Sequence, residues 1–396
     1  MAVAVPLVKI SEALNAGIPV AQHRDRRYIA PVAAPDSPAL APPAAADRFV
    51  EESAARLWPG SQVAKPTAVP GDASSRRYFR YLISNCADAP ATVVVMVMED
   101  AAIALSSDEL GVFGEDGPEE LAFLNVARFL APRTSAIPEI YASADDNSLV
   151  MLEDVGDVPL WEAATAPKGN GPAATEDYFR AALDALAELQ ERSSDDGTGC
   201  YAFRQAFDER LFGWELEHFL EYGVAGADPT LMDAARAELT ALAGELGRLP
   251  RVFCHRDYHA WNIHWHEGRV RIIDFQDALL APAVYDVASL LTDRVTPTGV
   301  DPQMEARLVE YYFDQQTAGR LSSLAATKEA YARCALQRVL KVVGRFNYLA
   351  DVKGKTGYAQ MLPTVAANAR RLVESMENLD ATQILMQQHA RDGVSH

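Results

Sequence analysis

The feature that most constrains the fold is a change of pattern near residue 157. Before it, the chain shows short runs of β-branched and aromatic residues, which are typical of strands. After it, apolar residues recur every three or four positions, which is typical of helices. One strand-like island, residues 252–273, interrupts the helical part. This order of elements predicts an α+β fold with a β-rich first lobe and a mainly helical second lobe.

The strand-like runs of the first half stand between clear turn signals. Asp47 is expected to cap an early helix that stops at Pro59-Gly60, and a second helix is expected over residues 119–130. Four runs are expected to be strands: residues 77–84, 92–98, 137–142 and 148–153.

The second half is expected to be helical around the one island. Thr175 is expected to cap the first of these helices, which carries Phe179, Leu183, Leu186 and Leu189. Within the island, residues 263–266 and 270–273 form a hairpin about Glu267-Gly268. The remaining expected helices are residues 211–222, 231–246, 285–291, 305–316, 328–348 and 358–377.

The segment before the first lobe is rich in alanine and proline from Ala30 to Ala46. Proline removes backbone donors, and the segment has no periodic apolar face, so an extended tether is favoured. We therefore expect three parts: an appendage over residues 1–45, a β-rich lobe over 46–153 and a helical lobe over 154–390.

Charge and apolar content exclude several classes of protein. The chain carries 36 Lys+Arg against 55 Asp+Glu, a net charge of -19, which disfavours nucleic acid as a partner. No apolar run approaches the roughly 18 residues of a membrane-spanning helix, and the first residues lack the zones of a secretory signal. The four cysteines are scattered without a metal-binding spacing. We expect a cytoplasmic protein with no membrane partner.

The densest group of chemically competent residues lies in the island. His255-Arg256-Asp257 is followed by Asn262 and, after the hairpin, by Asp274. This spacing allows three oxygen-bearing side chains to converge. Phosphoryl transfer requires such a set: a carboxylate that orients the acceptor hydroxyl, and hard oxygen ligands for magnesium. The alternative interpretation is that these residues are turn aspartates and a capping asparagine.

These motifs resemble those of the aminoglycoside phosphotransferase and choline kinase superfamily, which has a protein kinase-like fold. Within it the chain is similar to bacterial anomeric kinases that phosphorylate N-acetylmuramate and N-acetylglucosamine during cell-wall recycling. The stretches that carry the resemblance together span residues 47–380: residues 71–80 (GDASSRRYFR), 120–126 (ELAFLNV), 149–157 (LVMLEDVGD), 255–263 and 273–291.

The resemblance implies roles for the residues of the island. It makes Asp257 the catalytic base, and Asn262 and Asp274 the ligands of Mg²⁺. Asp286, which is also suited to capping a helix, is expected to brace the catalytic loop. The implied activity is that of an ATP-dependent small-molecule kinase, which transfers phosphate to a hydroxyl group.

The resemblance also assigns the nucleotide contacts to the first lobe. The hinge whose backbone meets adenine corresponds to Leu149, Val150, Met151, Leu152 and Glu153. The loop over the phosphates corresponds to residues 71–77, where Ser74, Ser75 and Arg76 are expected to bind phosphate. An ordinary polar hairpin turn is the alternative for this loop.

One departure from ordinary kinases concerns the strand that normally supplies a phosphate-pairing lysine. Here residues 93–100 read VVVMVMED, with Met96 and Met98 and no lysine. Glu119 or Glu120 then lacks the usual partner. The absence of this lysine is consistent with the sugar-kinase branch. The alternative interpretation is a catalytically dead kinase-like binder.

The expected acceptor is an amino sugar, phosphorylated at its anomeric hydroxyl. Aminoglycosides or another small molecule are the alternative, since polycations suit an acidic surface. A protein kinase is disfavoured because only about a dozen residues separate Asp274 from the next expected helix, which leaves no room for a long activation segment. The sequence does not specify the oligomeric state or the group that replaces the missing lysine.

Overall fold

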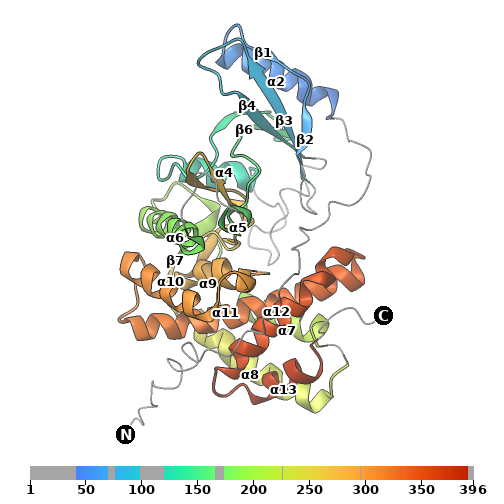
Figure 1. The fold of residues 1–396 in the computed structure, drawn as a ribbon, viewed down its shortest axis with the longest axis vertical. Helices are drawn as coiled ribbons and strands as arrows, with labels where there is room; N and C mark the ends of the chain where they lie inside the picture. The colour runs from blue at the N-terminus through green and yellow to red at the C-terminus, as the bar shows by residue number, and fades with distance from the viewer. Residues whose placement is uncertain are drawn as a thin grey trace. The chain divides into compact units, whose positions relative to one another are not determined.

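The computed structural model describes residues 42–69, 76–98, 120–165, 174–224, 226–294 and 296–390. They fall into two units (Figure 1). The first contains the described residues between 42 and 157 together with 264–277, and the second contains 158–263 together with those between 278 and 390. Within these ranges no helix has both the length and the apolar character needed to cross a bilayer.

An antiparallel sheet organises the first unit. Its strands pair in the order β1-β3-β4-β6-β5, and β2 pairs with β3 beside β1. Pro66 lies between β1 and β2, where the edge strand is interrupted. The bounds are β1 Gln62–Val63, β2 Thr67–Val69, β3 Arg76–Ser84, β4 Thr92–Met98, β5 Ile140–Ser143 and β6 Leu149–Glu153.

Side-chain alternation along β4 explains how the sheet buries one face. Val93, Val95 and Val97 point into a core that is closed by helix α2 (Ala44–Leu57), whose Val50 is fully buried. The sequence placed the start of this helix at Asp47, but the helix begins three residues earlier. Asp47 instead lies in the first turn and accepts a hydrogen bond from the Tyr81 hydroxyl at 2.9 Å.

The second helix of this unit also begins at a different residue from the one predicted. Helix α4 spans Ala122–Leu130, so Glu120 precedes it rather than lying on it. Glu120 accepts hydrogen bonds from Asn125 and Arg128, which gives it partners other than a strand lysine. Glu119 lies outside the described residues.

The hairpin of the island joins the first unit through a buried arginine. Strands β8 (Ile263–His266) and β9 (Arg269–Ile272) are connected by Glu267 and Gly268, both with positive φ, as a type I′ turn requires. Arg271 is 1% exposed, donates to the Glu153 carboxylate at 2.6 Å and also binds the carbonyl of Ile137 at 2.9 Å. This ion pair fixes β9 against the end of β6.

The second unit is built from helices with one short pair of antiparallel strands, β7 (Arg251–Cys254) and β10 (Leu279–Pro282). Thr175 is the first helical residue of α6 rather than its cap, and Ala174 holds the cap position. The helix expected over 358–377 is shorter, because a 3₁₀ turn, η5 (Thr356–Gln360), precedes it and Pro363 occupies its first turn. The helices are α5 Leu160–Thr165, α6 Thr175–Arg192, α7 Glu209–Tyr222, α8 Pro229–Gly247, α9 Val284–Thr292, α10 Pro302–Gln315, α11 Leu324–Asn347, α12 Leu362–Glu374 and α13 Asp380–Gln388.

Helices α7 and α11 run in the same direction and in close contact. Their register follows from two contacts. Glu215 meets Lys341, and Tyr222, about two turns further along α7, meets Tyr348, the residue after the end of α11. Gly344 allows the close approach, because a Cβ there would lie 2.7 Å from the Phe219 Cα.

Candidate active site

The loop that follows β7 is held in place by a carboxylate from helix α9. Asp286 is completely buried, and its two oxygens accept the backbone N–H groups of His255 at 2.6 Å and Arg256 at 3.0 Å. The expectation that Asp286 braces this loop is therefore confirmed. Burial raises the pKa of Asp286 to about 6, although the N–H groups and nearby His255 favour the ionised form.

The loop itself is a tight turn that brings Asn262 back to Asp257. Arg256 has a φ of 74°, a conformation that residues other than glycine rarely adopt. The Asn262 side chain donates from Nδ2 to the Asp257 carbonyl at 3.0 Å, and the His259 N–H donates to the same carbonyl at 2.9 Å. The backbone of Asp257 is thus fixed from two sides.

The carboxylate of Asp257 is oriented by Arg338 of helix α11. Nη2 of Arg338 lies 2.8 Å from Asp257 Oδ1 and 2.8 Å from Asp293 Oδ2, and Nη1 donates to the Arg256 carbonyl. The Arg338 side chain is 3% exposed, whereas that of Asp257 is 35% exposed. One oxygen of Asp257 is therefore held by the guanidinium, while Oδ2 has no hydrogen-bond donor among the described residues.

The charges around Asp257 keep it ionised. Burial by itself raises the pKa of this carboxyl, but Arg338 and Lys341 outweigh that effect and hold the pKa well below its usual value. An ionised carboxylate with one open oxygen is a hydrogen-bond acceptor, suited to orient a hydroxyl group and receive its proton.

A second buried carboxylate, Glu215 of α7, extends this network. Glu215 is 1% exposed and binds Lys341 Nζ at 2.6 Å and Gln337 Nε2 at 2.9 Å, with Arg256 Nη2 at 3.5 Å. Burial raises its pKa, and Lys341 and Arg256 lower it further than burial raises it, so the group is ionised. The residue before Asp257 is thus tied to α7 and α11.

Sequence analysis missed Arg338, Glu215, Lys341 and Asp293. They lie up to 84 residues from Asp257 along the chain, on or directly after helices whose order gives no spacing rule. The sequence signal that could have found them is a charged residue at a core-facing position of an amphipathic helix. Charged residues are rarely buried unless they are paired.

In the first unit, Asp274 follows β9 with a φ of 65°. Its side chain is 43% exposed. Asp274 Oδ1 accepts Arg76 Nη1 at 3.2 Å and Gln276 Nε2 at 2.9 Å. Of the three residues expected to contact phosphate, Arg76 therefore lies beside Asp274, whereas Ser74 and Ser75 lie outside the described residues.

Arg76 also lies on the sheet face where the lysine is missing. In the β3–β4 register, Arg76 pairs with Met98 and Tyr78 pairs with Met96. Because directly opposed residues share a face of the sheet, the Arg76 side chain leaves from the same face as these two methionines.

The residues expected to form the hinge make up strand β6. Leu149 to Leu152 are buried, and the strand pairs with β4 on one side and β5 on the other. Beyond Glu153 the chain leaves the sheet, and Arg80 binds both Asp154 and Asp157 with distances of 2.6 to 2.8 Å. We therefore expect backbone N–H and C=O groups without a strand partner at the C-terminal end of β6, and not at its centre.

Asn262 and Asp274 have the donor chemistry that magnesium prefers. Asn262 uses its Nδ2 within the loop, which leaves Oδ1 without a donor among the described residues. Near Asp274, the buried Oε1 of Gln276 also has no hydrogen-bond partner in the described part of the chain. Amide and carboxylate oxygens suit a hard cation, so these residues fit a magnesium ligand role.

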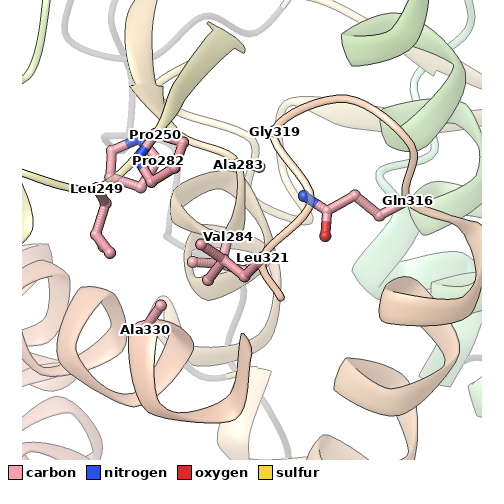
Figure 2. Close-up of a pocket in the computed structure, with 9 residues that line it drawn as sticks. All are labelled: Leu249, Pro250, Pro282, Ala283, Val284, Gln316, Gly319, Leu321 and Ala330. Atoms are coloured by element: carbon pink, nitrogen blue, oxygen red, sulfur yellow. The ribbon is translucent and has the colours of Figure 1, made fainter. Parts of the chain in front are cut away.

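A small pocket of the second unit is lined by none of the loop residues 255–262 (Figure 2). Leu249, Val284 and Leu321 give it an apolar lining, and Gln316 is its one polar side chain among the labelled residues. It contains no carboxylate or basic group, so it lacks the chemistry assigned to the loop.

Comparison with known proteins places this geometry in context. The model of the phosphotransferase enzyme family matches residues 65–324. A protein of Pseudomonas aeruginosa named N-acetylmuramate/N-acetylglucosamine kinase is 30% identical over 251 residues, which cover 61% of this chain and 70% of that protein. A protein of Pseudomonas putida with the same name is 27% identical over 319 residues, covering 78% and 83%.

Solved structures resemble the fold at low sequence identity. A choline kinase from Cryptosporidium parvum has a TM-score of 0.53 at 13% identity, covering 86% of this chain and 97% of that one. An aminoglycoside phosphotransferase in ternary complex with ADP and hygromycin B has a TM-score of 0.50 at 16% identity, covering 82% and 98%. The α+β kinase-like fold expected from the sequence is confirmed.

Proposed function

The chain belongs to the phosphotransferase enzyme family, and from that premise we propose that it transfers the γ-phosphate of ATP to the anomeric hydroxyl of an amino sugar. The proposed acceptors are N-acetylmuramate and N-acetylglucosamine, which appear in the names of the two bacterial relatives. From the resemblance noted in the sequence we propose a role in cell-wall recycling, with the cytoplasm as the compartment.

The observation that carries this proposal is the state of Asp257. Arg338 binds one of its oxygens and holds it ionised, and the other oxygen is open to an acceptor hydroxyl. A carboxylate with so low a pKa is a weak base, so its task is orientation first and proton acceptance late in the transfer. An anomeric hydroxyl is more acidic than an ordinary alcohol, so a weak base accepts its proton more easily.

The nucleotide is proposed to bind through the first unit. Leu149 to Glu153 form the proposed hinge, with the adenine contacts at its C-terminal end, where strand pairing ends. Ser74, Ser75 and Arg76 are the proposed phosphate contacts. Since Arg76 shares a face with Met96 and Met98, its guanidinium is proposed to supply the positive charge that the missing lysine would have supplied.

Asn262 and Asp274 are the proposed ligands of Mg²⁺, which neutralises charge on the nucleotide phosphates when it is bound. Arg76 binds Asp274 Oδ1 and thereby orients this carboxylate before the nucleotide arrives. Gln276 binds the same oxygen, so Oδ2 is the atom proposed to face the cation.

The test is to incubate the enzyme with ATP and magnesium and each candidate acceptor, and to locate the new phosphate by phosphorus NMR. The acceptors are N-acetylmuramate, N-acetylglucosamine, an aminoglycoside and choline. We expect an anomeric phosphate on one or both sugars. Transfer to the aminoglycoside or choline with none to either sugar would overturn the choice of acceptor, and no transfer to any of them would favour a catalytically dead binder.

A further inference from the structure

Arg80 connects two sequence motifs at residues to which the proposed function gives no role. It ends the stretch GDASSRRYFR, residues 71–80, and binds two aspartates of LVMLEDVGD, residues 149–157. Its Nε and Nη2 donate to the two oxygens of Asp154 at 2.6 and 2.8 Å, and its Nη1 and Nη2 donate to those of Asp157 at 2.6 and 2.7 Å. Bidentate pairs of this kind are the strong form of an ion pair and also fix its geometry.

The turn that follows β6 is anchored at Asp154 and Gly156. Asp154 accepts hydrogen bonds from the guanidinium of Arg80, from the Thr92 hydroxyl and from the Gly156 N–H, the last at 3.0 Å. Gly156 has a φ of 74°, and its carbonyl accepts a hydrogen bond from Nδ1 of His264 at 2.8 Å. Contacts with strands β3, β4 and β8 therefore fix the path of the chain beyond the sheet.

Val155, between these two anchors, has backbone groups that the protein does not use. The residue is 7% exposed, and its N–H and C=O make no hydrogen bond within the described part of the chain. The neighbouring groups are occupied, because the Glu153 N–H donates to the Glu139 carbonyl and both backbone groups of Gly156 have partners. A donor and an acceptor on one residue, both without protein partners, are suited to a ligand that presents the complementary pair.

Arg80 shares a face of the sheet with Arg76. Alternate residues of a strand point to the same side, so both arginines leave β3 away from Phe79 and Tyr81, which belong to the core beneath α2. Four residues of strand separate them by about 13 Å, which is comparable with the length of an extended nucleoside triphosphate. Arg76 binds Asp274, the proposed magnesium ligand, at one end of this distance, and Arg80 binds the turn after β6 at the other.

We propose that Arg80 is a positioning residue for the base of the nucleotide: it holds Asp154 and Asp157 so that the turn after β6 presents the Val155 N–H and C=O to adenine. The proposal rests on the proposed function and specifies how its nucleotide is recognised. The amino group and the adjacent ring nitrogen of adenine are the donor and acceptor that match these two backbone groups. Nε, Nη1 and Nη2 of Arg80 all donate to carboxylates, so Arg80 acts through the turn and not on phosphate.

Inosine triphosphate is the matched probe. It has the ribose and phosphates of ATP, but its base carries a carbonyl and a ring N–H in place of the amino group and the ring nitrogen. Calorimetry measures Kd of each nucleotide for the full chain, with magnesium and without acceptor, and wild type is expected to prefer ATP. Arg80→Gln is expected to raise Kd for ATP roughly tenfold, because the two carboxylates then face each other without a cation and the turn shifts, while Kd for inosine triphosphate stays within about twofold.

Three further variants control the comparison. Arg128→Gln is the matched control, because Arg128 is an exposed arginine of the same unit that pairs with Glu120, and it is expected to change neither Kd. Asp157→Asn is the milder change, since this carboxylate is 58% exposed and the Asp154 pair remains, so a smaller rise for ATP alone is expected. Arg80→Gln combined with Asp154→Asn should weaken ATP binding no more than Arg80→Gln does, because both changes act through one contact.

The measurement needs no acceptor, so this proposal and the proposed function fail separately. Selective weakening of ATP binding supports the role of Arg80 even where no phosphate is transferred. Equal weakening of both nucleotides, no weakening of either, losses that multiply in the double variant, or a wild type without preference for ATP would each overturn the proposal.

Discussion

At the scale of single residues, Asp257, the proposed base, meets two opposing requirements. A base that receives a proton must keep an open oxygen, yet an ionised carboxylate that is partly buried needs compensation. Arg338 resolves this by binding only Oδ1, and Asp293 accepts the same guanidinium nitrogen. The cost of burying Arg338 is offset by these two carboxylates, the Arg256 carbonyl and the Tyr285 hydroxyl, all of which accept from its guanidinium.

Asp257→Asn is expected to lower the rate of phosphoryl transfer by at least ~100-fold, because the amide cannot accept the hydroxyl proton. ATP binding is expected to remain, since the proposed base is expected to contact the acceptor and not the nucleotide. A coupled assay of ADP release gives the rate, and a fluorescent nucleotide titration gives the affinity. Turnover at the wild-type level would contradict the role of Asp257.

Arg338→Lys keeps a buried cation but loses the planar fork, whose Nη2 reaches both carboxylates and whose Nη1 reaches the Arg256 carbonyl. We expect kcat to fall roughly tenfold or more with KM for ATP unchanged, because Asp257 is less well oriented. The same change in an Asp257→Asn background should add little, since the carboxylate through which Arg338 acts is gone. If the losses of kcat from the two single changes multiply in the double variant, Arg338 acts independently of the Asp257 carboxylate.

Asp274→Ala is expected to abolish activity and the magnesium-dependent part of ATP affinity, because a proposed ligand of the cation is removed. ATP titrations with and without magnesium measure this directly. The control is Asp277→Ala, three residues further on and also near Gln276, which is expected to retain magnesium dependence. Titrations of Asp274→Ala that match wild type would remove Asp274 from the metal site.

At the scale of elements, the contact between α7 and α11 positions the charged network near Asp257. Gly344 sets this contact, since the Phe219 Cα and the His218 carbonyl would lie 2.7 and 2.8 Å from a Cβ at that position. Both neighbours are backbone atoms and cannot rotate away. The helices approach this closely only because residue 344 has no side chain.

Gly344→Ala is expected to destabilise the protein although alanine is the better helix former. Overpacking costs about 1–3 kcal/mol, which exceeds the propensity gain of about 1 kcal/mol. Gly213→Ala in α7 is the matched control: a Cβ there meets nothing within 4 Å, so propensity alone should stabilise it slightly. Urea denaturation compares the two. A more stable Gly344→Ala variant would mean that the helices separate without cost.

At the scale of the whole molecule, the described chain forms two units, and the island contributes to both. Its loop, with Asp257 and Asn262, belongs to the helical unit, whereas the hairpin and Asp274 belong to the β-rich unit through Arg271 and Glu153. The proposed base Asp257 and the proposed magnesium ligand Asn262 thus belong to the helical unit, whereas the other proposed ligand, Asp274, belongs to the β-rich unit.

Deleting residues 1–41 is expected to leave folding and turnover nearly unchanged, as no core-facing periodicity crosses that segment. The cut must precede Ala44, where α2 begins. Deleting residues 1–57 is the control and is expected to lower the melting temperature strongly, because the buried Ala46, Val50 and Ala54 are lost. A large drop in melting temperature with the shorter deletion would show that residues 1–41 dock onto the body.

The order of elements could be predicted from the sequence, and their exact ends could not. Strand β4 matched its predicted bounds because β-branched residues fill it and turn residues flank it. Helix α2 began earlier than Asp47 because Ala46 gains burial against the sheet, which outweighs the local capping preference of an aspartate. The predicted helix over 358–377 was wrong at its start, since Pro363 favours a new first turn.

The sequence alone determined the α+β order and the motif that carries Asp257, Asn262 and Asp274, because local periodicity and short spacings are encoded by neighbouring residues. Only the tertiary structure decided what surrounds them. Arg338, Glu215 and Asp286 reach the loop from three different helices, and Arg76 reaches Asp274 across 198 residues. Helix packing and strand register bring such partners together. Because a buried charge must be paired, the pairs form between residues that are far apart in the sequence and follow no fixed spacing.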